Sequence, residues 1–394
     1  MSLEDFVEIT EGKTRLLVPP LSLSNKVPPK VPAFFNPVAR LNRDVSILVY
    51  KTFIMNVKKD RRTFGDPFGG VGARSLRVAV EIPEVEHVFV NDRNTFAIDA
   101  ARKAASINLV SEKCSFTSED VISFLANHSS EKDERFTVVD LDPFGSPAEY
   151  VDCLLRAVVK GGMVSVTATD TAVLCGVHPN VCMRKYYGRS LHRSSYSRET
   201  ALRILISLIG LTAARLDLVV HPVFVHLNHH YIRVYLTASV SRTGANSINR
   251  KIGYLRDCIK CGDRNATFEL GHDDRCRLCG NAYRFAGMLW LAHLFDKIFV
   301  SKMLCMLDRE GDILGPVRHL KKTLSTCLNE LDDIPFYFQS DEIASRLSTN
   351  PTSLQNVIER LQSSGYRASR SSLDSNGFKT NAQVNQILDL LARS

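Results

Sequence analysis

The sequence predicts an α/β protein with a doubly wound parallel sheet, a cysteine-rich insertion and a C-terminal module in winged-helix order. Three observations predict it. From residue 62 to residue 170, short apolar runs alternate with segments of helical periodicity, as in a parallel sheet covered by helices on both faces. Two Cys-x-x-Cys pairs lie between residues 258 and 279. The chain from Ser340 onward then gives helix, helix and hairpin.

The N-terminal segment is expected to form a hairpin and a helix before the sheet begins. Residues 6–20 alternate around Gly12 as a hairpin does, and a Pro-rich connector follows. A helix is expected after Asn42, whose side chain can cap it, with Asp44 in its first turn. We therefore assign residues 1–30 to an N-terminal hairpin and linker.

The main domain is assigned to residues 31–245. The expected strands are residues 62–66, 85–92, 136–142 and 161–170 with a short one ending before 118, and the expected helices are 72–82, 95–109 and 146–160. Functional groups in such a sheet gather at the carboxyl ends of its strands. After a helix over 198–216, two β-rich runs, 217–230 and 231–241, have no helix between them and are expected to close the sheet as an antiparallel pair.

The rest of the chain divides into two further segments. A zinc-binding segment is assigned to residues 246–289, and a C-terminal domain to residues 290–394. The end of this domain contains two expected helices, 340–348 and 350–365, and then a hairpin with Asn376-Gly377 at its tip.

The composition is that of an ordinary globular protein, with 394 residues of which 44% are hydrophobic and 23% charged. The most apolar stretch contains Arg203 and Arg215, so we expect no membrane association. The opening residues lack the layout of a secretory signal. We expect a cytoplasmic protein, or a nuclear or mitochondrial one for a eukaryotic source, with no obligate protein partner implied.

A basic segment is the best compositional signal for a nucleic-acid partner. The formal charge is +8, and "RKYYGRSLHRSSYSR", residues 184–198, contains no acidic residue. Basic groups hold phosphates and tyrosine rings stack on bases, so this segment indicates nucleic-acid binding. A solvated basic helix face would have the same composition, and the segment alone does not separate the two.

The letters DPFG occur twice, each time after an expected strand. The first copy opens "DPFGGVGAR", where Gly69, Gly70 and Gly72 allow a ligand to approach the backbone closely. Ser75 stands where a dinucleotide-binding fingerprint has glycine or alanine, which disfavours an oxidoreductase. Asp92 follows the next strand, where a carboxylate either accepts both hydroxyls of a ribose or merely caps the following helix.

Two further acidic residues follow the third and fourth strands. Asp120 lies where an adenine amine is expected, so the acidic residues together fit an adenosine-containing cofactor. In the second DPFG, Asp142 can accept a hydrogen bond from an exocyclic amine, Pro143 leaves its carbonyl free, and Phe144 offers a face to a flipped base. A Pro-containing turn with a core phenylalanine is the alternative.

Four cysteines match a metal site: Cys258, Cys261, Cys276 and Cys279. They form two knuckles, each followed by glycine, with the spacing of a tetrahedral thiolate zinc site. A pair of disulfides is the alternative, which a reducing compartment disfavours. Four thiolates close the coordination sphere, so we expect structural zinc without a catalytic role.

Longer strings of the chain resemble the tRNA (guanine-N2)-dimethyltransferases, which methylate guanine 26 of tRNA from S-adenosylmethionine. They include "FFNPVARLNRD", "GARSLR", "VNDRN", "DLDPFGSPAEYVD", "VTATDTAVLCGVHPNVCMRKYYG", "HYIRVYL" and "GYRASRSSLDSNGFKTNA". The resemblance covers nearly the whole chain. It implies a class I methyltransferase (Rossmann-like) fold, S-adenosyl-L-methionine as cofactor, tRNA as substrate, and a C-terminal domain that binds tRNA.

The resemblance also implies cofactor contacts. Arg43 and Arg74 match arginines that hold the methionine carboxylate, Asp92 matches the ribose-binding acid, and Asp120 with Val121 matches the adenine contacts.

For the chemistry, the resemblance implies Asp142 as the catalytic aspartate, with Phe144 and Phe34 flanking the target base. The hypothesis is two successive methyl transfers to the exocyclic N2 of one guanine by direct in-line attack. The alternatives are an amino-methyltransferase acting on adenine or on a protein amide, and a non-catalytic tRNA-binding or folding factor.

Overall fold

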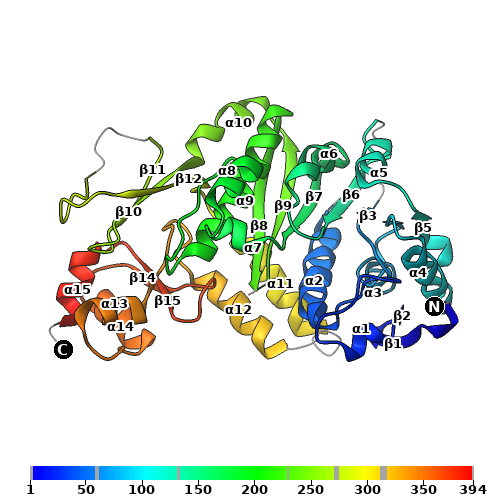
Figure 1. Cartoon of the computed structure of the whole chain (residues 1–394), viewed down its shortest axis with the longest axis horizontal. Coiled ribbons are helices and arrows are strands. Elements are labelled where there is room, and N and C mark those ends of the chain that lie inside the picture. The colour runs from blue at the N-terminus through cyan, green and yellow to red at the C-terminus, as the bar shows by residue number, and fades with distance from the viewer. Residues whose placement is uncertain are drawn as a thin grey trace.

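The computed structural model describes residues 3–57, 62–130, 134–228, 230–269, 275–310 and 317–392. Figure 1 shows an elongated molecule with the main sheet in its middle, the N-terminal hairpin at one end and the C-terminal module at the other.

Within the described residues, a seven-stranded sheet has the order β5-β4-β3-β6-β7-β9-β8. The strands from β5 to β7 are parallel, whereas β9 pairs antiparallel with both β7 and β8. The bounds are β3 Thr63–Asp66, β4 His87–Asn91, β5 Cys114–Thr117, β6 Phe136–Leu141, β7 Val158–Ala168, β8 Leu218–Asn228 and β9 Tyr231–Val240. The doubly wound sheet with a closing antiparallel pair is therefore confirmed.

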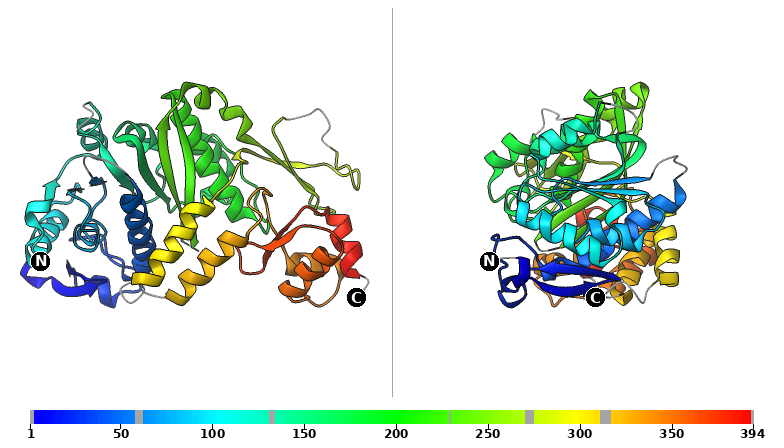
Figure 2. Two further views of the ribbon diagram at one scale, coloured as in Figure 1. Left: turned by 180° about the vertical axis from the view of Figure 1, so that it is seen from behind. Right: turned by 90° about the vertical axis from the view of Figure 1, so that its right-hand side faces the viewer.

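Helices cover both faces of this sheet (Figure 2). One face carries α2 Arg40–Asn56, α3 Ser75–Glu81, α4 Thr95–Ile107 and α11 Lys297–Glu310, and the other carries α5 Val121–Asn127, α6 Val151–Arg156 and α9 Ser197–Arg215. The shorter helices are α1 Leu21–Ser24, α7 Thr171–Leu174, α8 Pro179–Tyr186 and α10 Arg242–Asn246, and α12 is Val317–Asn329. Among the described residues, none of these helices combines the length and the hydropathy that crossing a bilayer requires.

Helix α2 begins earlier than the sequence predicted. A short 3-10 turn, Pro37–Ala39, precedes it directly, and Asn36 caps that turn. Asn42 lies inside α2, where its side-chain oxygen accepts a hydrogen bond from Arg74 Nη2 at 2.7 Å. The prediction of Asn42 as the helix cap, with Asp44 in the first turn, is therefore wrong, because a distant arginine takes the amide oxygen.

The N-terminal hairpin is confirmed, and buried charges fasten it to the helices. Its strands are β1 Val7–Glu11 and β2 Thr14–Val18. Glu11 accepts hydrogen bonds from Arg43 Nε and Nη2, both at 2.6 Å. Arg77, fully buried, donates to Asp44 at 2.6 Å and to Glu81 at 2.9 Å. Burial alone would raise the pKa of Glu11, but Arg43 and Arg77 lower it below its ordinary value.

Two small antiparallel sheets lie towards the C-terminal end of the described chain, with the orders β11-β10-β12 and β13-β15-β14. Their strands are β10 Ile252–Asp257, β11 Arg264–Thr267, β12 Arg284–Trp290, β13 Phe338–Gln339, β14 Ala368–Arg370 and β15 Gly377–Thr380. The last helices are α13 Ser340–Leu347, α14 Leu354–Ser363 and α15 Val384–Ala392. The first of these sheets extends from the main sheet towards α13–α15 (Figure 1).

The C-terminal module has the predicted order of two helices and a hairpin, but the hairpin turn differs. Gly377 donates to the carbonyl of Asp374 at 3.1 Å, and this closes a turn with Ser375 and Asn376 at its centre. Gly377 is already the first residue of β15, so the prediction of Asn376-Gly377 at the tip is wrong by one residue.

Buried charges also join this module to α9. Lys379 Nζ lies 2.8 Å from Glu330 Oε1 and 3.7 Å from Glu199 Oε1, and all three side chains are fully buried. Glu199 accepts a hydrogen bond from Phe336 N at 2.9 Å and pairs with Arg203 at 2.8 Å. The orientation of the C-terminal module is thus fixed by groups that lose their partners if it moves.

Candidate active site and cysteine centre

A cavity of ≈ 390 Å³ opens at the carboxyl edge of the main sheet. The chain order reverses here, since β4 lies on one side of β3 and β6 on the other, and such a switch point is where α/β sheets bind ligands. Six of the predicted site residues line the cavity: Phe34, Arg43, Arg74, Asp92, Asp142 and Phe144.

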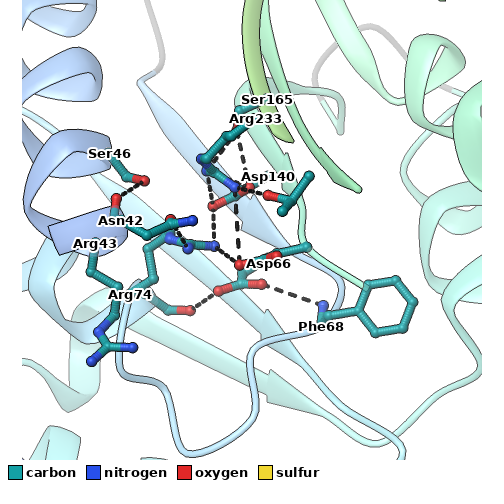
Figure 3. Close-up of polar contacts among 12 residues, drawn as sticks. Asn42, Arg43, Ser46, Asp66, Phe68, Arg74, Asp140, Ser165 and Arg233 are labelled. Atoms are coloured by element: carbon teal, nitrogen blue, oxygen red, sulfur yellow. Dashed lines mark hydrogen bonds and ion pairs between the residues drawn. The ribbon is translucent and has the colours of Figure 1, made fainter. Parts of the chain in front are cut away.

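A buried layer of charge lies beneath this cavity (Figure 3). Arg233 Nη2, on β9, lies 2.8 and 2.9 Å from the two carboxylate oxygens of Asp140, on β6. Arg74 Nη1 lies 2.8 Å from Asp140 Oδ2 and 2.7 Å from Asp142 Oδ2. Burial alone would raise the pKa of Asp140, but Arg233 and then Arg74 lower it below its ordinary value. The layer thereby ties the carboxylate of Asp142 to the sheet.

Sequence reasoning missed the two central members of this layer, Asp140 and Arg233. Arg233 donates to Tyr50 Oη at 2.7 Å and to Tyr235 Oη at 2.8 Å, and its Nη1 also donates to Thr167 Oγ1. The signal in the sequence was a charged residue at an inward position of an apolar strand, in "FTVVDLD" and "HYIRVYL". A buried charge in such a position needs partners, and these partners are far away in the chain.

The glycine turn after β3 meets Asp92 at the cavity. Gly70 N donates to Asp92 Oδ2 at 2.9 Å, and Asn94 N donates to Oδ1 at 2.8 Å. Gly70 has φ +53°, and a Cβ there would approach no atom closer than Phe34 O at 3.7 Å. The cavity is therefore open next to the backbone of Gly70. The cap of α4 is Asn94. Asp92 is therefore a cavity residue, and burial raises its pKa.

Asp66, from the first DPFG, also lines the cavity. It accepts hydrogen bonds from Ser75 Oγ at 2.5 Å and from Phe68 N at 3.3 Å. Ser75, which breaks the dinucleotide fingerprint, is thus the partner of a buried carboxyl group. Burial, and then the charge of Asp140, raises the pKa of Asp66 to about 7. Sequence reasoning assigned no role to this residue.

Two aromatic rings stand at the mouth of the cavity. The ring centroids of Phe34 and Phe144 are 4.8 Å apart at an interplanar angle of 83°. Phe144 is 60% exposed, and Lys30 Nζ lies 4.9 Å from its centroid. Asn94 Nδ2 donates to the carbonyl of Pro32 at 2.7 Å, which anchors the segment that carries Phe34. The structure therefore brings the two predicted phenylalanines together and adds Lys30, which no sequence pattern indicated.

Three predicted cofactor residues have other partners or lie elsewhere. Arg43 lines the cavity, but its guanidinium group donates two hydrogen bonds to the carboxylate of Glu11. Asp120 caps α5 by accepting a hydrogen bond from Ile122 N at 2.9 Å, and Val121 is buried at the start of that helix. Neither Asp120 nor Val121 is among the described residues that line the cavity.

The donors and acceptors of the cavity fit a nucleoside that carries an amino-acid chain. Arg74 Nε is buried and has no hydrogen-bond partner among the described residues, so a cationic donor is available for a carboxylate. Asp92 offers acceptors for ribose hydroxyls beside the open face of Gly70. The volume is within the range of sites for ligands of this size.

The four cysteines form a second centre, away from the cavity. The sulfur atoms of Cys258, Cys261, Cys276 and Cys279 all lie within 4.8 Å of one another, and none forms a disulfide. Tetrahedral zinc with Zn–S bonds of about 2.3 Å places its sulfurs about 3.8 Å apart. The two knuckles are built alike, since Gly262 N and Gly280 N donate at 2.8 Å to the carbonyls of the first cysteine in each. The donor set fits structural zinc, and the disulfide alternative is wrong.

The sheet order and this cavity define the class of protein: a Rossmann-like methyltransferase that uses S-adenosylmethionine. The family profile of the N2,N2-dimethylguanosine tRNA methyltransferases matches residues 12–392. The chain belongs to this family.

Individual relatives match along almost their whole length. The tRNA (guanine(26)-N(2))-dimethyltransferase of Methanothermobacter thermautotrophicus is 32% identical over 393 residues, covering 98% of both chains. The enzyme of the same name from Pyrococcus furiosus is 32% identical over 404 residues, covering 100% of both. The structure of Trm1 from Pyrococcus horikoshii with S-adenosyl-L-methionine matches with a TM-score of 0.80 at 29% identity, covering 98% of this chain and 99% of that one.

Asp66 gives a pH prediction. Its pKa in the folded chain is raised from 3.8 to about 7, so the unfolded state ionises first and the folded state loses stability as pH rises from about 4 to about 7. Asp66→Asn keeps the group neutral and should gain, relative to wild type, on the order of 4 kcal/mol as pH rises from about 4 to about 7. Thermal melts across that range measure this, with Asp99→Asn, an exposed acid, as control. Equal pH dependence in wild type and Asp66→Asn would contradict the assignment.

The cysteine centre gives a metal prediction. Purified protein should contain a single zinc ion in this segment, and Cys258→Ser should lose it and melt at a lower temperature, because metal binding stabilises such small segments. Elemental analysis and thermal melts measure both effects. Cys305→Ser, at an exposed cysteine outside the cluster, should keep the metal. Full zinc content in Cys258→Ser would show that this cysteine is not a ligand.

Proposed function

We propose that the cavity between β3 and β6 is where this chain carries out the reaction of its family, with Asp142 facing the reacting amine. That reaction is the transfer of two methyl groups from S-adenosylmethionine to the exocyclic N2 of guanine 26 in tRNA. The observation that carries the proposal is that Asp142, Asp92 and the Phe34–Phe144 pair line one cavity.

Asp142 orients the amine and takes its proton. Arg74 holds Asp142 Oδ2 at 2.7 Å, and we assign Oδ1 to accept a hydrogen bond from an N–H of guanine. An amine conjugated to a purine ring is a weak nucleophile, and hydrogen-bond acceptance by a carboxylate turns its lone pair towards the methyl group. S-adenosylmethionine supplies that methyl group, whose bond to sulfur breaks as its bond to nitrogen forms. The nitrogen then gives up one proton, and the remaining N–H is used in the second transfer.

The aromatic pair receives the flipped base. Phe144 is exposed enough to offer a ring face to guanine, and Phe34 borders it edge-on. Lys30 covers the Phe144 ring in the free chain.

The other end of the cavity holds the methyl donor. Asp92 accepts the ribose hydroxyls beside Gly70, and Arg74 Nε donates to the methionine carboxylate. Arg43, which lines the cavity while paired with Glu11, adds positive charge at this end. Asp120 and Val121 stand at the carboxyl end of β5, next to β4, and we assign the adenine contacts to them.

The tRNA itself needs a wider surface than this cavity. We assign it to the C-terminal domain, residues 290–394, and to the basic segment 184–198, whose side chains suit phosphates. The main domain, residues 31–245, and the zinc-binding segment, residues 246–289, complete the proposed organisation. With tRNA as substrate, we propose a cytoplasmic location.

The test of this function is nucleoside analysis of tRNA incubated with the protein and labelled S-adenosylmethionine. Wild type should yield N2,N2-dimethylguanosine, whereas Asp142→Asn should transfer methyl groups about 10²- to 10⁴-fold more slowly, because its amide cannot take the proton. Calorimetry should show nearly unchanged S-adenosylmethionine binding in this variant.

Asp152→Asn is the matched control, since Asp152 is a surface residue of α6 that pairs with Arg156, and it should react like wild type. Labelled adenosine in place of guanosine, or normal turnover by Asp142→Asn, would contradict the proposal.

A further inference from the structure

A second cavity, of ≈ 400 Å³, lies where the basic segment meets the sheet β11-β10-β12. The connections between the strands of this sheet carry the four cysteines. One wall is residues 189–192, from the connection between α8 and α9, and the other is residues 283–285, at the start of β12. Neither the methyl-transfer chemistry nor the cysteine centre uses this cavity.

The two walls are fixed to each other. Arg189 and Gly287 form an antiparallel bridge, in which Gly287 N donates to Arg189 O at 3.0 Å. Arg284 Nη1 donates to the carbonyl of His192 at 3.1 Å, and its Nε lies 2.9 Å from Asp257 Oδ2. The cavity is thus a feature of the folded chain and does not depend on a loose surface loop.

The cysteine centre holds the second wall in place. Tyr283 is 8% exposed and packs with Cys258 and Cys276. Its hydroxyl donates to Asp263 Oδ2 at 2.6 Å, and Asp263 follows the first knuckle. The zinc-binding segment therefore shapes this cavity.

The lining groups suit a phosphodiester and its sugar or base. Arg189 is exposed, and among the described residues no carboxylate pairs with its side chain. Ser190 is 3% exposed, lines the cavity, and its hydroxyl is buried without a hydrogen-bond partner in the described chain. Since buried hydroxyls normally find partners, this orphan donor indicates a missing acceptor. Phe285, partly exposed, offers an apolar surface beside these two groups.

The same stretch of chain builds both cavities. Thr167 and Thr169 line the catalytic cavity at the end of β7, and the chain then runs through α7 and α8 to residue 189. Tyr186 Oη donates to Asp170 Oδ1 at 2.6 Å, which ties the end of α8 back to the catalytic edge.

We propose that this second cavity binds a backbone phosphate of the tRNA, outside the target nucleotide, through Arg189 and Ser190. The proposal rests on the proposed function for the identity of the nucleic acid. Of the four residues of the basic segment that line the cavity, it selects Arg189 and Ser190, and it gives the zinc-binding segment a role in substrate binding.

The experiment measures dissociation constants for an unmodified tRNA transcript over a series of salt concentrations. Arg189→Ala should weaken binding roughly tenfold and reduce the slope of log K against log salt by about one, because one phosphate contact is lost. Ser190→Ala should weaken binding without lowering the melting temperature, because its hydroxyl makes no hydrogen bond in the free chain. Arg102→Ala, at an exposed arginine on α4, is the charge-matched control and should bind like wild type.

Two results would overturn the inference: an Arg189→Ala affinity and salt slope equal to those of Arg102→Ala, or a Ser190→Ala enzyme that binds tRNA like wild type. Failure of the proposed function would give a different result from failure of this inference. The wild-type protein would then bind tRNA but form no dimethylguanosine.

Discussion

The ion pair between Asp140 and Arg233 is the interaction on which the site depends. Asp140 is fully buried on β6 and can remain ionised because Arg233, from β9, and Arg74, from the start of α3, surround it. Removing one partner of a buried pair leaves an uncompensated charge, which costs several kcal/mol. The pair therefore holds β6, β9 and the glycine turn in one arrangement. Arg74, oriented by Asp140, is then in position to hold Asp142 at the cavity.

Buried charge is used in the same way at three places along the chain. The cluster of Glu11, Arg43 and Arg77 holds the N-terminal hairpin against α2 and α3. Lys379 and Glu330, with the carboxylate of Glu199, hold the C-terminal module against α9. Each cluster joins segments that are remote in sequence, so each fixes the relative position of those segments. Arg43, which pairs with Glu11 of the hairpin, also donates to the carbonyl of Asn36 at 3.1 Å, close to Phe34 in the chain.

Sequence reasoning predicted what local patterns determine, and it missed what distant partners determine. Strand and helix alternation sets the order of the sheet, so Asp92 and Asp142 could be placed at one edge, and cysteine spacing revealed the metal centre. The predicted start of α2 was wrong. Asn42 lies inside the helix, where its side-chain oxygen accepts a hydrogen bond from Arg74, 32 residues away. Asp140 and Arg233 are 93 residues apart, and no local pattern pairs them. The two DPFG copies face one cavity, and in the first copy Asp66 is a buried member of the site.

The central claim is that the buried charge layer positions Asp142 for catalysis. The most direct measurement is the single-turnover rate of methyl transfer by Arg233→Met at saturating tRNA and S-adenosylmethionine, compared with Arg233→Lys. The account predicts a rate about 10²-fold lower in Arg233→Met, partly restored by lysine, in an enzyme that still binds S-adenosylmethionine, because a misplaced carboxylate orients the amine poorly. A wild-type rate in Arg233→Met enzyme would contradict it.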